Sequence, residues 1–113
     1  MISQEINKIL AGEEGWINLF VDDDGVVHGD PPHNGNIDNM ATPVPDYTTK
    51  LRACMGVSYI LTLVVKFDFT NGELALFDRL GNKIRQHFMS DRNALAAALA
   101  LRLAEIAKER RGC

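Results

Sequence analysis

Residues 59–69, in which apolar side chains recur at alternate positions, and the Asn71-Gly72 pair that follows constrain the fold of this chain more than any other feature. One set of alternate residues in the strand is wholly apolar, which is typical of a β-strand packed on a core. Asn71-Gly72 favours a two-residue hairpin, because a type I′ turn needs positive φ at both central positions. The pattern therefore predicts a three-stranded antiparallel meander within residues 58–89. The expected strands are residues 59–69, 73–80 and 83–89.

Helical periodicity surrounds this meander. Apolar residues at helical spacing predict a first helix near the N-terminus, a second before the meander and a long alanine-rich helix after it. The expected N-caps are Ser3, Thr48 and Ser90. The expected ends are Gly12 or Gly15, Gly56 and about Arg110. The expected buried stripe of the last helix is Leu95, Leu99, Leu103 and Ile106.

A second hairpin is expected between the first two helices. Residues 16–21 are aromatic and β-branched, and residues 26–28 can return beside them. Residues 22–25 read Asp-Asp-Asp-Gly, in which aspartate bonds nearby backbone and glycine accepts positive φ. Residues 29–45 contain four prolines and are expected to be a flexible loop.

These elements predict an α+β fold in a single domain over residues 1–113, with a frayed tail at 109–113. The antiparallel sheet would consist of the meander and the N-terminal hairpin, packed by two or three helices. The 46% hydrophobic content is that of a globular protein, without an apolar run long enough to span a membrane. Two cysteines and the lack of a signal peptide favour reduced thiols in a cytoplasmic setting.

The net charge of −3 conceals an uneven distribution. Residues 1–46 hold nine acidic residues and one basic residue, for a net charge of −8. Residues 47–113 hold six acidic and eleven basic residues, for a net charge of +5. The two halves can attract each other within one domain, or the first half can present an acidic face to a basic partner. The overall acidity argues against nucleic acid as the partner.

Residues 22–38 are the main candidate for chemistry, since they hold five of the nine aspartates and two of the three histidines. A calcium loop is excluded by spacing: with Gly25 at its sixth position, Phe20 and Pro31 would occupy positions that need carboxylates. His28, Asp30 and His33 can hold a Zn²⁺ ion loosely. The sequence has no motif for a catalytic nucleophile or a phosphate-binding loop, so no catalytic residue and no cofactor are expected.

The order of the elements resembles the phage ABA sandwich domain, a family of small phage proteins of unknown function. The resemblance rests on Pro45-Asp46-Tyr47-Thr48-Thr49 at the start of the middle helix and on the Asn93–Leu99 segment that opens the last helix. It spans roughly residues 2–107. The resemblance implies a fold and a phage or prophage origin, and it supplies no catalytic residues.

The leading hypothesis is a small phage or prophage accessory protein that binds another protein in the host cytoplasm. Its acidic half suits the inhibition of a host factor, and no membrane partner is expected. The expected binding residues are Asp22, Asp23, Asp24 and Asp30. The alternative is a metal-binding protein or metal-dependent enzyme that uses His28, Asp30 and His33. A subunit of a homo-oligomer is a third possibility.

Overall fold

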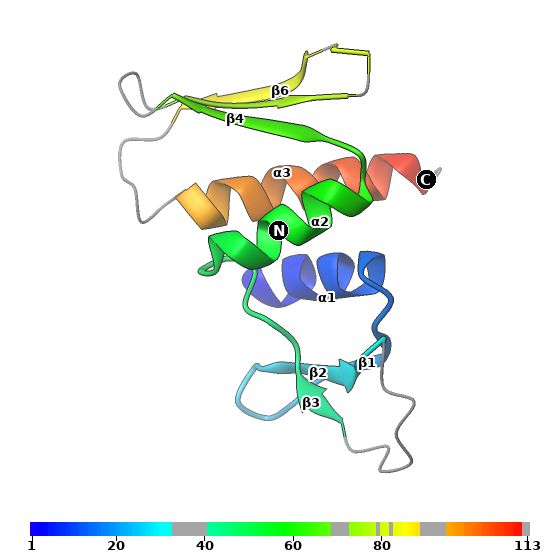
Figure 1. Cartoon of the computed structure of the whole chain (residues 1–113). Helices are drawn as coiled ribbons and strands as arrows, with labels where there is room; N and C mark the ends of the chain where they lie inside the picture. Colours follow the sequence, from blue (N-terminus) through cyan, green and yellow to red (C-terminus); the bar gives the residue numbers. More distant parts are fainter. Residues whose placement is uncertain (33–40, 69–72, 79, 82, 89–94, 112–113) are drawn as a thin grey trace.

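The computed structural model describes residues 1–32, 41–68, 73–78, 80–81, 83–88 and 95–111. Within these residues, helices form a central layer and an antiparallel sheet lies on each side of it (Figure 1). The helices are α1 (Ser3–Glu13), α2 (Leu51–Ile60) and α3 (Leu95–Arg110). The predicted α+β class is confirmed. The N-terminal hairpin, however, forms a sheet of its own and does not extend the meander.

The N-terminal sheet has the strand order β1-β2-β3 and lies next to α1 (Figure 1). Its strands are β1 (Ile17–Val21), β2 (Val27–Asp30) and β3 (Thr42–Pro43). The predicted hairpin is confirmed, with Val21 opposite Val27 and Phe20 opposite His28. The prediction of a continuous loop over residues 29–45 is wrong at both ends. Gly29 pairs with Thr42 because β3 runs antiparallel beside β2. Residues 33–40 lie outside the described part of the chain.

The meander forms the second sheet, in the order β4-β5-β6, on the side of α2 and α3 (Figure 1). Its strands are β4 (Val64–Asp68), β5 (Glu73–Phe77) and β6 (Lys83–Phe88). Leu74 and Leu76 are almost fully buried and face the core together with the half-buried Val65 and Phe67. This two-residue period confirms the predicted meander. The turn at Asn71-Gly72 lies outside the described residues.

The boundary between α2 and the meander differs from the prediction. Residues 59–60 continue the helix, so the first strand begins at Val64 and not at Tyr59. The helix ends with Thr62 in the left-handed conformation at φ 58°. The Thr62 N–H donates to the Tyr59 carbonyl and the Leu63 N–H to the Ser58 carbonyl, which together make a Schellman motif.

Gly56, predicted to stop this helix, lies inside it. A β-carbon at Gly56 would lie 3.3 Å from Glu14 Oε2, so the glycine allows the end of α1 to approach α2 closely. The predicted N-cap is also displaced. Lys50 occupies that position without a side-chain hydrogen bond, and the Thr48 hydroxyl instead donates to Asp46 Oδ1.

Helix α1 begins after Ile2, so Ser3 is its first helical residue and not its cap. It ends as predicted near Gly15, which has φ 96°. The Gly15 and Trp16 N–H groups donate to the Gly12 and Ala11 carbonyls, the same Schellman pattern as at Thr62. Two helix ends of this chain therefore use one geometry, once with glycine and once with a β-branched residue.

Helix α3 buries the predicted stripe of leucine and isoleucine against the core. Its alanines at positions 100, 104 and 107 are fully buried, which allows α1 and α2 to pack closely beside it. Helix and turn continue through Arg111, which pairs with Glu13, and the predicted frayed tail at 109–113 stays a prediction. The predicted cap Ser90 lies outside the described residues. No helix in the described ranges is long and apolar enough to cross a bilayer.

Candidate protein-binding surface

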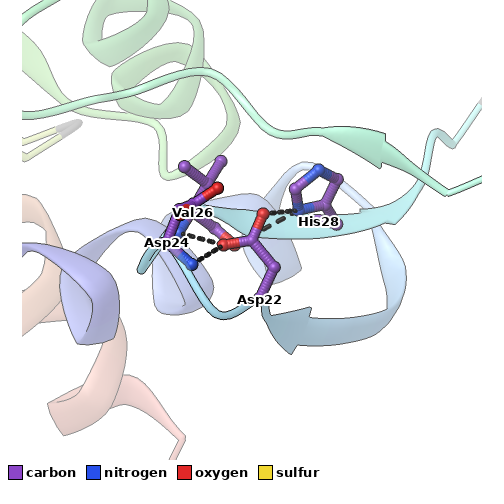
Figure 2. Close-up of polar contacts among 4 residues, drawn as sticks. All are labelled: Asp22, Asp24, Val26 and His28. Atoms are coloured by element: carbon purple, nitrogen blue, oxygen red, sulfur yellow. Dashed lines mark hydrogen bonds and ion pairs between the residues drawn. The ribbon is translucent and has the colours of Figure 1, made fainter.

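The turn between β1 and β2 is built by Asp22. Its Oδ1 accepts hydrogen bonds from the backbone N–H groups of Asp24 and Val26, both at 2.9 Å (Figure 2). Gly25 completes the turn at φ 81° and donates its N–H to the Asp22 carbonyl. The predicted turn chemistry is thus present. Asp22 is therefore a structural residue of the hairpin, since its carboxylate is already engaged by the backbone.

His28 is held against the same turn. Its Nδ1 lies 3.4 Å from Asp22 Oδ2 and 3.2 Å from the Val26 carbonyl oxygen (Figure 2). Both of these neighbours are acceptors, so an N–H at Nδ1 can donate to them. The imidazole also stacks on Phe20, with ring centroids 5.5 Å apart. These contacts fix the ring orientation and leave Nε2 as the nitrogen that can accept a bond.

The other predicted aspartates divide into two kinds. Asp30 Oδ2 accepts a hydrogen bond from the Asn18 side chain at 2.7 Å, across the irregular pairing of β1 with β2. Asp23 and Asp24 are exposed at the tip of the turn. Within the described residues their carboxylates make no hydrogen bond or ion pair. Of the four predicted binding residues, these two are therefore the ones available to a partner.

Exposed apolar side chains lie next to this acidic tip. Phe20 and Val26 are 46% and 42% exposed, and cross-strand pairing puts them on the same side of the hairpin as His28. Ile17, at 61% exposure, is paired with Asp30. We call this set the hairpin surface, and it comprises Ile17, Phe20, Asp23, Asp24 and Val26. It combines apolar side chains with acidic groups at their edge, a composition found at protein interfaces.

The two oppositely charged halves do meet, although not at the hairpin. Glu13 pairs with Arg111 at 2.8 Å, and Glu5 pairs with Lys108 at 3.6 Å. Both pairs join α1 to the end of α3, and the exposed pair of Glu5 and Lys108 contributes little stability. Internal attraction therefore accounts for part of the charge distribution. Across the described part of the chain, it leaves the aspartates at the hairpin tip without a basic neighbour.

A buried polar cluster, which sequence reasoning missed, joins α1 to the start of α2. The hydroxyl of the fully buried Tyr47 donates to Glu14 Oε1, and the Tyr47 N–H donates to Asn7 Oδ1. Burial, followed by the nearby Glu14 carboxylate, raises the pKa of Tyr47 far above its usual value. The sequence pattern of residues 45–49 indicates only the start of a helix. The tyrosine in it is nevertheless a signal, because a buried tyrosine hydroxyl usually has a hydrogen-bond partner.

Cys54 and Asp46 belong to the same cluster. The Cys54 thiol donates to the Tyr47 carbonyl at 3.0 Å, and burial raises its pKa to about 12, with smaller contributions from Glu14 and Asp46. Burial would raise the pKa of Asp46, but hydrogen bonds from Thr48 and Asn7 outweigh it and lower that pKa. Cys54 is thus a buried thiol with a raised pKa, which does not suit a nucleophile.

The described part of the chain contains no cluster of possible metal ligands that would support the metal hypothesis. In those residues no three histidine, cysteine or carboxylate side chains gather around a common point. His28 and Asp30 lie two residues apart on β2 and are engaged by Asp22 and Asn18. The third predicted ligand, His33, lies outside the described residues, so the complete set stays a prediction.

Comparisons of this chain with protein-family models, curated proteins and solved structures found no match.

Proposed function

We propose that this chain is a binding protein that engages another protein through the hairpin surface. The observation that carries the proposal is the juxtaposition of exposed Phe20 and Val26 with two unneutralised aspartates on a turn held rigid by Asp22. A rigid turn lowers the entropy that binding must overcome. Apolar contacts at the centre and charges at the edge then supply affinity and orientation, respectively.

The partner that fits this surface has an apolar patch bordered by lysine or arginine. Asp23 and Asp24 would meet those cations at an exposed rim, where charge pairs mainly accelerate association and depend on salt. A second copy of the chain is disfavoured in a two-fold contact, because that symmetry brings like surfaces together and thus two acidic turns. A foreign partner is therefore the better occupant.

The resemblance to the phage ABA sandwich domain supports a phage or prophage origin for the chain. On that basis we propose that the partner is a host protein in the cytoplasm and that binding inhibits it. A nucleic-acid-binding defence component would carry the basic surface that the acidic turn requires.

The test is capture of partners from bacterial host lysate by the tagged chain. The double substitution Asp23→Asn and Asp24→Asn removes two charges while Asp22 keeps the turn intact. We expect a captured protein to be depleted several-fold, and more strongly at low salt. The control, Glu105→Gln with Glu109→Gln, removes the same charge from α3, where Glu105 pairs with Arg102, and is expected to retain the partner. A partner that is equally retained by both variants would contradict the role of the hairpin surface.

A further inference from the structure

A groove of about 440 Å³ lies where α1, β1 and the end of α3 meet. This volume is within the range of small-molecule sites, roughly 300–1,000 Å³. Its apolar lining consists of Ile2, Ile9 and Val21, and its charged lining consists of Glu5, Lys8 and Lys108. The groove is separate from the hairpin surface, because Val21 alternates with Phe20 and faces the opposite side of β1.

The apolar part of the groove is a strip in which Ile9 packs partly against the core, whereas Ile2 and Val21 remain exposed. Ile9 belongs to α1 and Ile2 directly precedes the helix, and both side chains line the groove. Ile2 is 65% exposed and Val21 is 38% exposed, although both are apolar. Such a strip between a helix and a strand suits a narrow hydrocarbon chain better than it suits a branched or polar ligand.

The charges around the groove leave one cation available. Glu5 and Lys108 neutralise each other, with 3.6 Å between Oε1 and Nζ. Lys8, one turn along α1 from Gln4 and Glu5, makes no ion pair or hydrogen bond with any described residue. The groove therefore combines an apolar strip with a single unpaired ammonium group at its rim, on a chain whose N-terminal half is otherwise acidic.

We propose that this groove binds a single-chain aliphatic carboxylate, with the hydrocarbon tail along Ile2, Ile9 and Val21 and the carboxylate at Lys8. One ammonium group matches one negative charge, and the volume accommodates one chain of medium length. The inference is independent of the hairpin surface, since it shares none of its residues.

Isothermal titration of the full chain with two probes of equal tail length, decanoate and decylammonium, tests the proposal below their micellar concentrations. We expect decanoate to bind and decylammonium to bind at least fivefold more weakly, which is the effect of about 1 kcal/mol from one exposed charge pair. Each methylene buried should improve affinity by up to fourfold, so octanoate should bind more weakly than decanoate. Equal binding of both head groups, or no binding of decanoate, would overturn the proposal.

Variants locate the site. Lys8→Gln should weaken the affinity for decanoate about fivefold, whereas Lys8→Arg should retain it. The control Lys50→Gln changes an exposed lysine before α2 and should leave the affinity for decanoate unchanged. Methyl NMR should show decanoate-dependent shifts at Ile9 and Val21 and none at Leu76 of the core. Unchanged affinity in Lys8→Gln, or shifts confined to other methyl groups, would refute the assignment. Binding of the chain to anionic vesicles without binding of monomeric decanoate would also refute the proposal.

Discussion

The two sheets of this protein have the same number of described strands, but they differ in how deeply they bury their apolar side chains. The meander turns Leu74 and Leu76 into the core, at 1% and 0% exposure. The N-terminal sheet buries Val27 but leaves Phe20 and Val26 about half exposed. The difference indicates that the meander completes the core against α2 and α3, whereas the hairpin adds surface more than stability.

The strongest test of this contrast is a pair of truncations. Leu76→Ala should lower the free energy of unfolding by about 3 kcal/mol, because it leaves a cavity in the core. Phe20→Ala should cost about 1 kcal/mol or less, because the ring is exposed and loses mainly its stacking on His28. Urea denaturation followed by circular dichroism measures both. Equal losses would mean that the hairpin belongs to the stabilising core.

The hairpin nevertheless has one tightly packed position. A β-carbon at Gly29 would lie 2.6 Å from Leu19 Cδ2 and 3.0 Å from the Ile17 carbonyl oxygen. Gly29→Ala should therefore cost about 2 kcal/mol through the clash with β1. The control, Gly12→Ala in α1, meets no atom within 4 Å and should raise stability by about 0.5–1 kcal/mol. Loss of stability in both variants would contradict the packing described.

The link between the hairpin and the helices can be tested by pH. Asp46 accepts hydrogen bonds from Thr48 and Asn7, and these hold its folded pKa below the usual 3.8. The stability that ionised Asp46 contributes is therefore present above pH 3.8 and is lost as the pH falls through the pKa of Asp46 in the folded state. Asp46→Ala should cost about 1 kcal/mol at pH 7, as removal of a capping residue does. The difference in the free energy of unfolding between this variant and the unmodified chain should be smaller at pH 3 than at pH 7. An equal difference at both pH values would mean that Asp46 does not stabilise the fold through its charged form.

The junction that leads into the meander contains an unfavourable backbone position. Thr62 adopts φ 58°, where a β-branched residue is strained and glycine is not. Thr62→Gly should raise the free energy of unfolding by up to about 1 kcal/mol, although it loses the hydroxyl bond to the Leu61 carbonyl. Thermal denaturation measures the gain. The comparison variant Gly15→Thr places a threonine at the equivalent position of α1 and should lower stability by more, because its β-carbon would also lie 3.1 Å from Pro32 Cβ.

The smallest expected effect concerns the metal hypothesis. No three possible ligands gather around a common point within the described residues, so addition of Zn²⁺, Mn²⁺ or Mg²⁺ should leave the melting temperature unchanged. Differential scanning fluorimetry and metal analysis of the purified chain measure this. A stabilising shift that disappears in His33→Gln would restore the three-ligand site as a function of residues 22–38.

Local chemistry made much of the structure predictable. The turn at residues 22–25 follows from hydrogen bonds between Asp22 and groups at most four residues away, so no distant contact is needed to specify it. The same holds for the end of α1 at Gly15. The buried stripe of α3 and the alternation of β4 and β5 follow from periodicity alone, because a helix and a strand repeat at 3.6 and 2 residues.

The candidate site was predictable only in part. The sequence located the acidic hairpin but treated its aspartates as equivalent, since the partners of Asp22 and Asp30 depend on how β1 pairs with β2. It also could not show that Phe20 and Val26 would remain exposed. That outcome depends on which face of the hairpin α1 covers.

What the sequence by itself determined is the identity of the main elements, the turn chemistry and the uneven charge. The tertiary structure decided where α2 ends, because burial of Val57 and Ser58 near α3 extends the helix past Gly56. It also decided that helices separate the two sheets (Figure 1). Residues of α1, β1 and α3 form one groove for the same reason. These outcomes depend on contacts between distant segments, whose energies no local pattern contains.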